Sequence, residues 1–111
     1  MIESGQLSSI VDPESSYIYW NLKNPVVGGM SKEKIALRRA IAMSRSIDQE
    51  IKLVRNDDAQ RLHFPIPPGV VGNDPQYRTS TPYSVKAANL LLDRYHYKKD
   101  ASGWRTQPDG K

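Results

Sequence analysis

One stretch near the middle of the chain, residues 56–82, constrains the fold more than any other feature of the sequence. It reads NDDAQRLHFPIPPGVVGNDPQYRTSTP and contains five prolines and two glycines. Because proline lacks the backbone N–H that a helix interior or a central strand needs, Pro65, Pro67 and Pro68 exclude regular structure around them. We therefore predict a long irregular loop over 56–82. A loop of this length in a small domain usually carries function or packs against something large.

The residues outside this loop leave room for one small domain. The chain has 111 residues, of which 38% are hydrophobic and 25% charged. A domain of this size buries roughly two thirds of its unfolded surface, so the expected core is thin. The net charge is +4, from 16 basic and 12 acidic residues that are interleaved along the chain. That interleaving favours a mixed, solvated surface over a nucleic-acid patch.

The residue types that carry chemistry are sparse. The chain has no cysteine, which excludes disulfides and thiolate catalysis. His63 and His96 are the two histidines, and neither has a second histidine at helical ligand spacing. Gly28-Gly29 is too short for a phosphate-binding loop. No stretch approaches the ~20 apolar residues of a membrane helix. We therefore expect no enzymatic activity, no metal, no cofactor and no membrane span.

Two helices are predicted before the long loop. Ser31 is a good N-cap residue, and apolar side chains follow at three- and four-residue steps. The members of this stripe are Leu37, Ala40, Ile41, Ser44, Ile47, Ile51 and Val54. This pattern fits one helix over 31–55, but the sequence SRSIDQE within it contains residues that compete for backbone hydrogen bonds and prefer caps. We therefore expect a break near Ser46–Asp48 and a second, short helix that ends near Arg55.

A third helix is predicted after the loop. Ser84 begins it, and its apolar face consists of Ala87, Ala88, Leu91, Leu92 and Tyr95. We expect this helix to end near His96 or Tyr97.

Two segments favour β-structure. Residues 16–22, SYIYWNL, contain strand-forming side chains on both faces, which predicts a strand covered on both sides. Residues 104–106 precede the turn signal Pro-Asp-Gly and are expected to form the first strand of a hairpin. The predicted fold class is α+β, with two to three helices packed on a small sheet. Residues 1–16 are expected to be a loose lead-in, and 17–111 the structured part.

The order of the segments resembles a known arrangement. The segments are YIYWN, LRRAIAMSRSID, PIPPGVVGNDP, YSVKAANLLLD and DASGWRTQPDGK. In this order they resemble the central part of the family 5 extracellular solute-binding proteins, the peptide-binding components of bacterial ABC importers. The resemblance covers residues from about Tyr17 to Lys111. Each motif alone is common, and the specificity lies in their order and spacing.

Individual positions carry this resemblance. Asp48 matches the aspartate that starts the family's next helix, and Arg39, Ala40 and Ile41 match its Arg-x-Ala-type core. The later helix is similar to a Tyr-Asp-Pro-x-x-Ala-x-x-Leu-Leu pattern at Tyr83, Ala88, Leu91, Leu92 and Asp93. The chain departs from the pattern where Ser84 and Val85 replace Asp-Pro, and where His96 replaces the glycine that follows the helix.

The resemblance implies a fold and a function. The chain would be an internal fragment of one lobe of a two-lobed periplasmic-binding-protein fold. The parent protein would be periplasmic, would capture peptides or similar small solutes by closing two lobes around them, and would deliver them to an ABC permease. It would not bind nucleic acid or span the membrane. The candidate ligand-binding residues are Tyr19, Trp20 and Asn21, with packing inside the lobe as the alternative. The main ligand residues are expected outside the chain.

A second interpretation comes from a different functional class. The chain would be a free-standing small basic domain that binds nucleic acid through YIYW and the arginine-rich helix, or a protein partner through the proline-rich loop.

Overall fold

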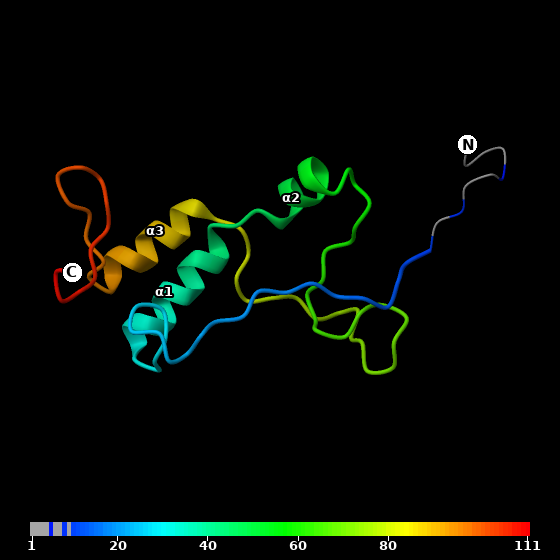
Figure 1. Cartoon of the computed structure of the whole chain (residues 1–111), viewed down its shortest axis with the longest axis horizontal. Helices are drawn as coiled ribbons and strands as arrows, with labels where there is room; N and C mark the ends of the chain where they lie inside the picture. Colours follow the sequence, from blue (N-terminus) through cyan, green and yellow to red (C-terminus); the bar gives the residue numbers. More distant parts are fainter. Residues whose placement is uncertain (1–4, 6–7, 9) are drawn as a thin grey trace. The chain divides into compact units, whose positions relative to one another are not determined.

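The computed structural model describes Gly5, Ser8 and residues 10–111, and three α-helices make up the regular structure of this part (Figure 1). Helix α1 spans Lys32–Met43, α2 spans Ile47–Val54 and α3 spans Val85–Arg94. The rest of the described chain consists of turns and irregular segments, so the helices and their connections determine where any site lies.

The chain forms two compact units. One contains the described residues up to Tyr17 together with Leu62–Thr79. The other contains Ile18–Arg61 and Ser80–Lys111, and it holds all three helices. Part of the predicted lead-in over 1–16 lies outside the described residues, and the described part of it contains no helix or strand.

The prediction of an α+β fold with a small sheet is wrong, because the described residues contain no strand. Residues 16–22 have the side chains of a strand, and Ile18 is 62% exposed. Side-chain preference favours an extended backbone, but a strand forms only where a second segment supplies a hydrogen-bonded ladder. Residues 104–106 are reduced to one antiparallel bridge between Lys99 and Arg105. The fold is therefore dominated by helices.

Serine caps determine where the helices begin. The serine hydroxyl oxygen accepts a backbone N–H three residues later at each start: Ser31 from Lys34, Ser46 from Gln49 and Ser84 from Ala87. Each cap satisfies one of the N–H groups that have no partner within the helix. The predicted starts at Ser31 and Ser84 and the predicted break near Ser46 are confirmed.

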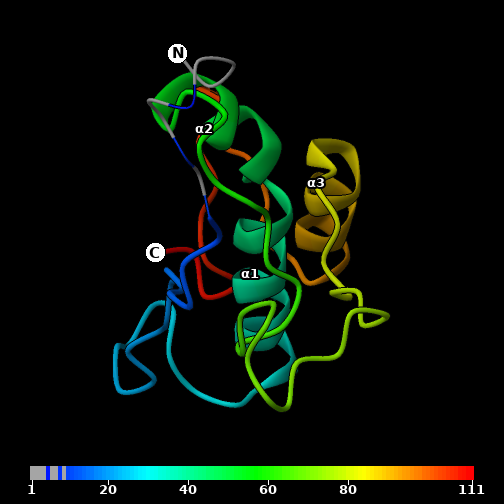
Figure 2. The same cartoon turned by 90° about the vertical axis from the view of Figure 1, so that its right-hand side faces the viewer.

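The core lies between α1 and α3, which run side by side in both views (Figure 1 and Figure 2). Its buried hydrophobic residues are Ala36 and Ala40 of α1, Ala88 of α3, and Tyr97. Alanine side chains let two helix backbones approach closely, because the distance between helix axes depends on the side chains at the contact. The predicted stripe placed Ile41 on the buried face of α1, but Ile41 is exposed.

Tyr97 closes one end of this helix pair. Its side chain is only 3% exposed, and its hydroxyl donates to the backbone carbonyl of Glu33 at 3.1 Å. Burial raises the pKa of the Tyr97 phenol, and the carboxylates of Glu33 and Asp109 raise it further. Tyr97 therefore links the segment after α3 to the first turn of α1.

Helix α3 ends without a glycine, because His96 takes the backbone conformation that glycine usually supplies after a helix. The backbone N–H of Tyr97 donates to the backbone carbonyl of Leu92 at 3.0 Å, and that of His96 donates to the backbone carbonyl of Asp93 at 3.2 Å. This pair of bonds is a Schellman motif, which requires a left-handed residue at the position of His96. His96 has φ of 68°. The helix ends at Arg94, before the predicted end, because this motif begins at Tyr95.

Arg105 holds the C-terminal segment against α3. One end of its guanidinium donates to the Asp93 carboxylate at 2.7 Å and to the backbone carbonyl of Tyr97. The other nitrogen donates to the side-chain carbonyl of Asn89 at 2.8 Å. A planar guanidinium can satisfy several acceptors at once, and this geometry fixes the position of Tyr97. The predicted Pro-Asp-Gly turn follows, with the N–H of Gly110 donating to Gln107 at 2.8 Å.

The predicted loop over 56–82 is confirmed as irregular, and its central part is ordered by local contacts. The rings of Phe64 and Tyr77 meet edge to face, with centroids 5.5 Å apart. The side-chain amide of Asn73 donates to the backbone carbonyl of Ile66 at 2.6 Å. Nδ1 of His63 accepts the backbone N–H of Thr79 at 3.4 Å, which gives this histidine a structural role.

We predict that His96→Gly stabilises the chain by about 1 kcal/mol, because glycine adopts positive φ without the steric cost that a side chain adds. Urea denaturation followed by circular dichroism at 222 nm measures this change. Arg94→Gly, at the last residue of α3, is the matched control: Arg94 has no positive φ, so glycine there should not stabilise the chain. A loss of stability in His96→Gly would contradict the proposed backbone strain.

We also predict that Tyr97→Phe destabilises the chain by about 1 kcal/mol, because the part-buried hydrogen bond from the Tyr97 hydroxyl to the Glu33 carbonyl is lost. Because the pKa of Tyr97 is higher in the folded than in the unfolded chain, stability also depends on pH. The neutral phenol contributes its full stability below the ordinary phenol pKa of 10.0, and this contribution is lost as pH rises through the pKa of the folded chain. Denaturation at pH 8 and at about pH 11 measures both effects. Tyr83→Phe, at an exposed tyrosine, should change neither. Equal alkaline loss in Tyr97→Phe and the original chain would contradict the assignment.

Candidate binding site

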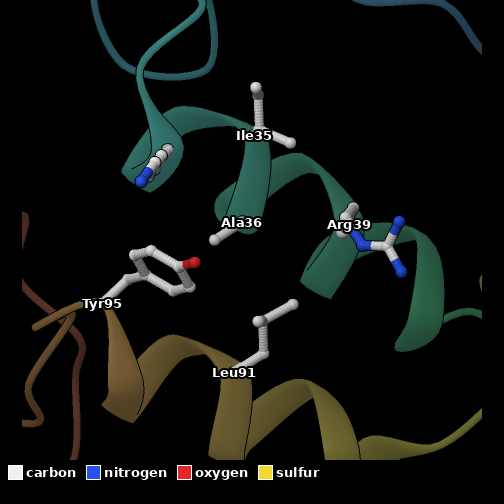
Figure 3. Close-up of a pocket in the computed structure, with 6 residues that line it drawn as sticks. Ile35, Ala36, Arg39, Leu91 and Tyr95 are labelled. Carbon is white, nitrogen blue, oxygen red and sulfur yellow. The ribbon is translucent and has the colours of Figure 1, made fainter.

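An open groove runs between α1 and α3 (Figure 3). Six residues line it: Lys32, Ile35, Ala36 and Arg39 from α1, and Leu91 and Tyr95 from α3. In the close-up, Leu91 and Tyr95 point from α3 toward α1, and the Arg39 guanidinium lies at one side. We call this site the α1–α3 groove.

The spacing of residues along each helix builds the groove. The four α1 residues stand at positions i, i+3, i+4 and i+7, which places them on one face of a helix. Leu91 and Tyr95 are four residues apart and therefore share one face of α3. Ala36 is buried at the floor, and Ile35 is 41% exposed at the edge. The site is apolar, with a cation near each end of its α1 side.

Acidic side chains do not line this groove. The acidic residues within the two helices are Glu33 and Asp93. The backbone N–H of Glu33 and the Ser31 hydroxyl, with a smaller contribution from Lys32, hold the pKa of Glu33 below its ordinary value. Asp93 is paired with Arg105. The groove therefore presents positive charge around an apolar floor.

The predicted ligand-binding residues lie elsewhere in the same unit. Tyr19 is 80% exposed, and Trp20 is half-buried. The side-chain oxygen of Asn21 accepts the backbone N–H of Lys23 at 3.1 Å, so Asn21 begins a turn. None of the three is among the residues that line the α1–α3 groove. Their role in ligand binding stays a prediction.

The turn that begins at Asn21 belongs to a compact loop, residues 21–29. The side-chain oxygen of Asn24 accepts the N–H of Val26 at 2.8 Å and that of Val27 at 3.2 Å. Gly28 is buried at the point where the loop closes on itself, and a Cβ there would lie 2.4 Å from the carbonyl oxygen of Leu22. Only glycine fits this close approach of two backbone segments.

Two cations of α1 hold this loop in place. Arg38 donates to the carbonyls of Val27 at 2.8 Å and Gly29 at 2.7 Å. Lys34 donates to the carbonyls of Pro25 and Val26 at 2.9 Å and 2.8 Å. The same ammonium reaches the side chain of Gln107 at 3.0 Å. These basic residues therefore stabilise the fold, and their donors are directed at protein acceptors.

Metal and membrane sites receive no support in the described part of the chain. In that part, no three or more His, Asp or Glu side chains come together as metal ligands. None of its helices combines the length and the apolar character needed to cross a bilayer.

Comparison with known proteins gave no relative. No family model, curated protein or solved structure matches the chain.

Sequence reasoning missed the α1–α3 groove. Ala88, Leu91 and Tyr95 were predicted as part of one apolar face, and the arginines of the first helix were considered for nucleic-acid binding, not as the edge of a groove. The available signal was the pattern Lys32, Ile35, Ala36, Arg39, which places two cations and two apolar residues on one helix face. The pattern does not show which helix packs beside that face.

We predict that Gly28→Ala destabilises the chain by about 1–3 kcal/mol, because the added methyl forces the backbone of the 21–29 loop to move. Thermal unfolding followed by circular dichroism measures the change. Gly103→Ala is the control: Gly103 has φ of 86° but nothing within 4 Å of the added methyl, so it reports backbone strain without crowding. If Gly28→Ala left the stability unchanged while Gly103→Ala lowered it, the close approach would not constrain the loop.

Proposed function

We propose that this chain forms part of a periplasmic solute-binding protein that captures peptides or similar small solutes and delivers them to the permease of an ABC importer. The observation that carries the proposal is the order of the five motifs between Tyr17 and Lys111. Capture by such a protein makes and breaks no covalent bond, which agrees with the sparse chemistry of the sequence.

The break between α1 and α2 supports this proposal. Helix α1 ends at Met43, and α2 begins at Ile47 with Asp48 in its first turn. The motif pattern places a helix break at this aspartate. A carboxylate in the first turn of a helix is favoured by the helix dipole, so the residue has a local structural reason to be there.

The apolar surface of the helical unit also supports it. Several large apolar side chains remain at least 40% exposed: Ile18, Leu22, Met30, Leu90 and Trp104. The four buried hydrophobic residues include three alanines. A unit with so small a buried core leaves apolar side chains that further protein could cover. A chain that packs against the remainder of a larger binding protein would expose such residues when it stands alone.

The second interpretation, a free nucleic-acid-binding domain, has less support. It requires the cations of α1 to contact phosphates. Arg38 and Lys34 instead donate to backbone carbonyls of the 21–29 loop, as described above. Arg45 is paired with Glu50, and Arg105 with Asp93. Phosphate binding would have to compete with these interactions.

We predict that the chain alone binds di- to pentapeptides with a Kd weaker than about 1 mM, because capture requires two lobes to close around the ligand and the chain would supply part of one lobe. Titration of the 15N-labelled chain with a mixture of di- to pentapeptides, followed by amide chemical shifts, measures this. Saturable shifts at submillimolar peptide would contradict the proposal.

We further predict that Trp20→Ala, made in the complete protein that the gene encodes, weakens peptide binding at least about tenfold, since a buried aromatic contact at a binding interface is worth about 2 kcal/mol. Isothermal titration calorimetry measures the affinity. Trp104→Ala is a matched control, because Trp104 is the chain's other tryptophan and is 76% exposed. Equal affinities for both variants would show that Trp20 does not contact the peptide. If the complete protein bound no peptide, the proposed function itself would be contradicted.

A further inference from the structure

The α1–α3 groove combines an open apolar surface with two cations, a combination that suits the apolar face of a charged helix. Its floor and walls are apolar, formed by Ala36, Leu91 and Tyr95, with Ile35 at the edge (Figure 3). Lys32 and Arg39 stand seven residues apart on the same face of α1, about 10 Å along the helix axis. An apolar groove between two helices is a common receptor for the apolar face of a third.

The charges around the groove favour a partner with negatively charged side chains. Its lining includes two cations and no carboxylate. Arg39 donates one bond, to the carbonyl of Ser80 at 3.3 Å, and a guanidinium has five N–H donors. Glu33 lies beside Lys32, where it interacts with Ser31 and its own backbone. A partner with carboxylates at both ends of an apolar stripe would therefore complement the groove.

We propose that the α1–α3 groove binds an acidic amphipathic helix of a partner protein. Two carboxylates seven residues apart on that helix would reach Lys32 and Arg39, and the apolar residues between them would cover Ala36 and Leu91. Helix spacing supports this match, because residues seven apart lie on one face of both helices.

The same features argue against other occupants. An anionic membrane would require apolar side chains that protrude from a cationic face, whereas these residues line a recess. A second copy of the chain would have to present two carboxylates seven residues apart on one helix, but α2 carries Asp48 and Glu50 only two residues apart, and α1 and α3 carry one acidic residue each. The proposal does not depend on solute capture.

The probe for this proposal is a pair of fluorescein-labelled helical peptides of about 14 residues, or four turns. Both carry leucines at the positions that face the groove. One carries glutamates at the two flanking positions, and the other carries lysines there. Fluorescence anisotropy measures their binding to the full chain at low and at high salt. We expect the acidic peptide to bind at least about tenfold more tightly than the basic one, with the difference reduced by salt.

Variants of the chain test whether the acidic peptide binds in the α1–α3 groove. Lys32→Glu combined with Arg39→Glu should weaken the acidic peptide at least about tenfold, and Lys23→Glu combined with Lys111→Glu, at two exposed lysines, should change its affinity less than about twofold. Ile35→Ser tests the apolar edge, with Leu53→Ser on the exposed face of α2 as its control. If charge reversal lowers the helix content, Lys32→Gln and Arg39→Gln replace it, with a smaller expected loss.

Several outcomes would overturn the proposal. These are equal binding of the two peptides, no binding of the acidic peptide at about 1 mM, and an affinity that charge removal leaves unchanged. If analytical ultracentrifugation showed that the chain self-associates, and that Lys32→Gln with Arg39→Gln prevents this, the groove would bind a second copy of the chain. Binding to phosphatidylglycerol vesicles in place of the acidic peptide would assign it to a membrane surface.

Discussion

The close contact between α1 and α3 is the interaction on which the rest of the helical unit depends. Alanines at the contact bring the two backbones together, and Tyr97 covers one end of the pair. Tyr97 reaches that position because His96 takes a left-handed conformation and turns the chain back over α1. Arg105 then fixes the following segment to α3. The groove exists because two helices with small contact residues leave their larger neighbours at the rim.

This arrangement carries little apolar burial, and that has consequences for function. Three of the four buried hydrophobic residues are alanines, which contribute little transfer free energy each. Polar contacts, such as those of Arg38 and Lys34 to the 21–29 loop, position the surrounding segments. A unit of this kind exposes apolar side chains for further protein to cover. Part of a larger solute-binding protein fits this description, and so does a receptor for an acidic helix.

Local sequence signals predicted the helices well and the sheet poorly. A serine followed by an apolar period marks a helix start, because capping and periodicity act within a few residues. Residues 16–22 and 104–106 carry strand preferences, but a strand also requires a partner segment, and the sequence does not show which segment would pair. The proline-rich segment 56–82 was predictable because proline acts locally. The groove was not, because it depends on which helix packs beside α1.

The stable centre of the helical unit is most directly tested by native-state hydrogen exchange, read by two-dimensional NMR, because exchange reports the free energy of opening for each amide. We expect the slowest exchange for the amides of α1 and α3 and for Tyr97, with faster exchange in α2, whose residues are not buried. Exchange in α1 and α3 as fast as in the loop over 56–82, or protection in α2 equal to theirs, would contradict it.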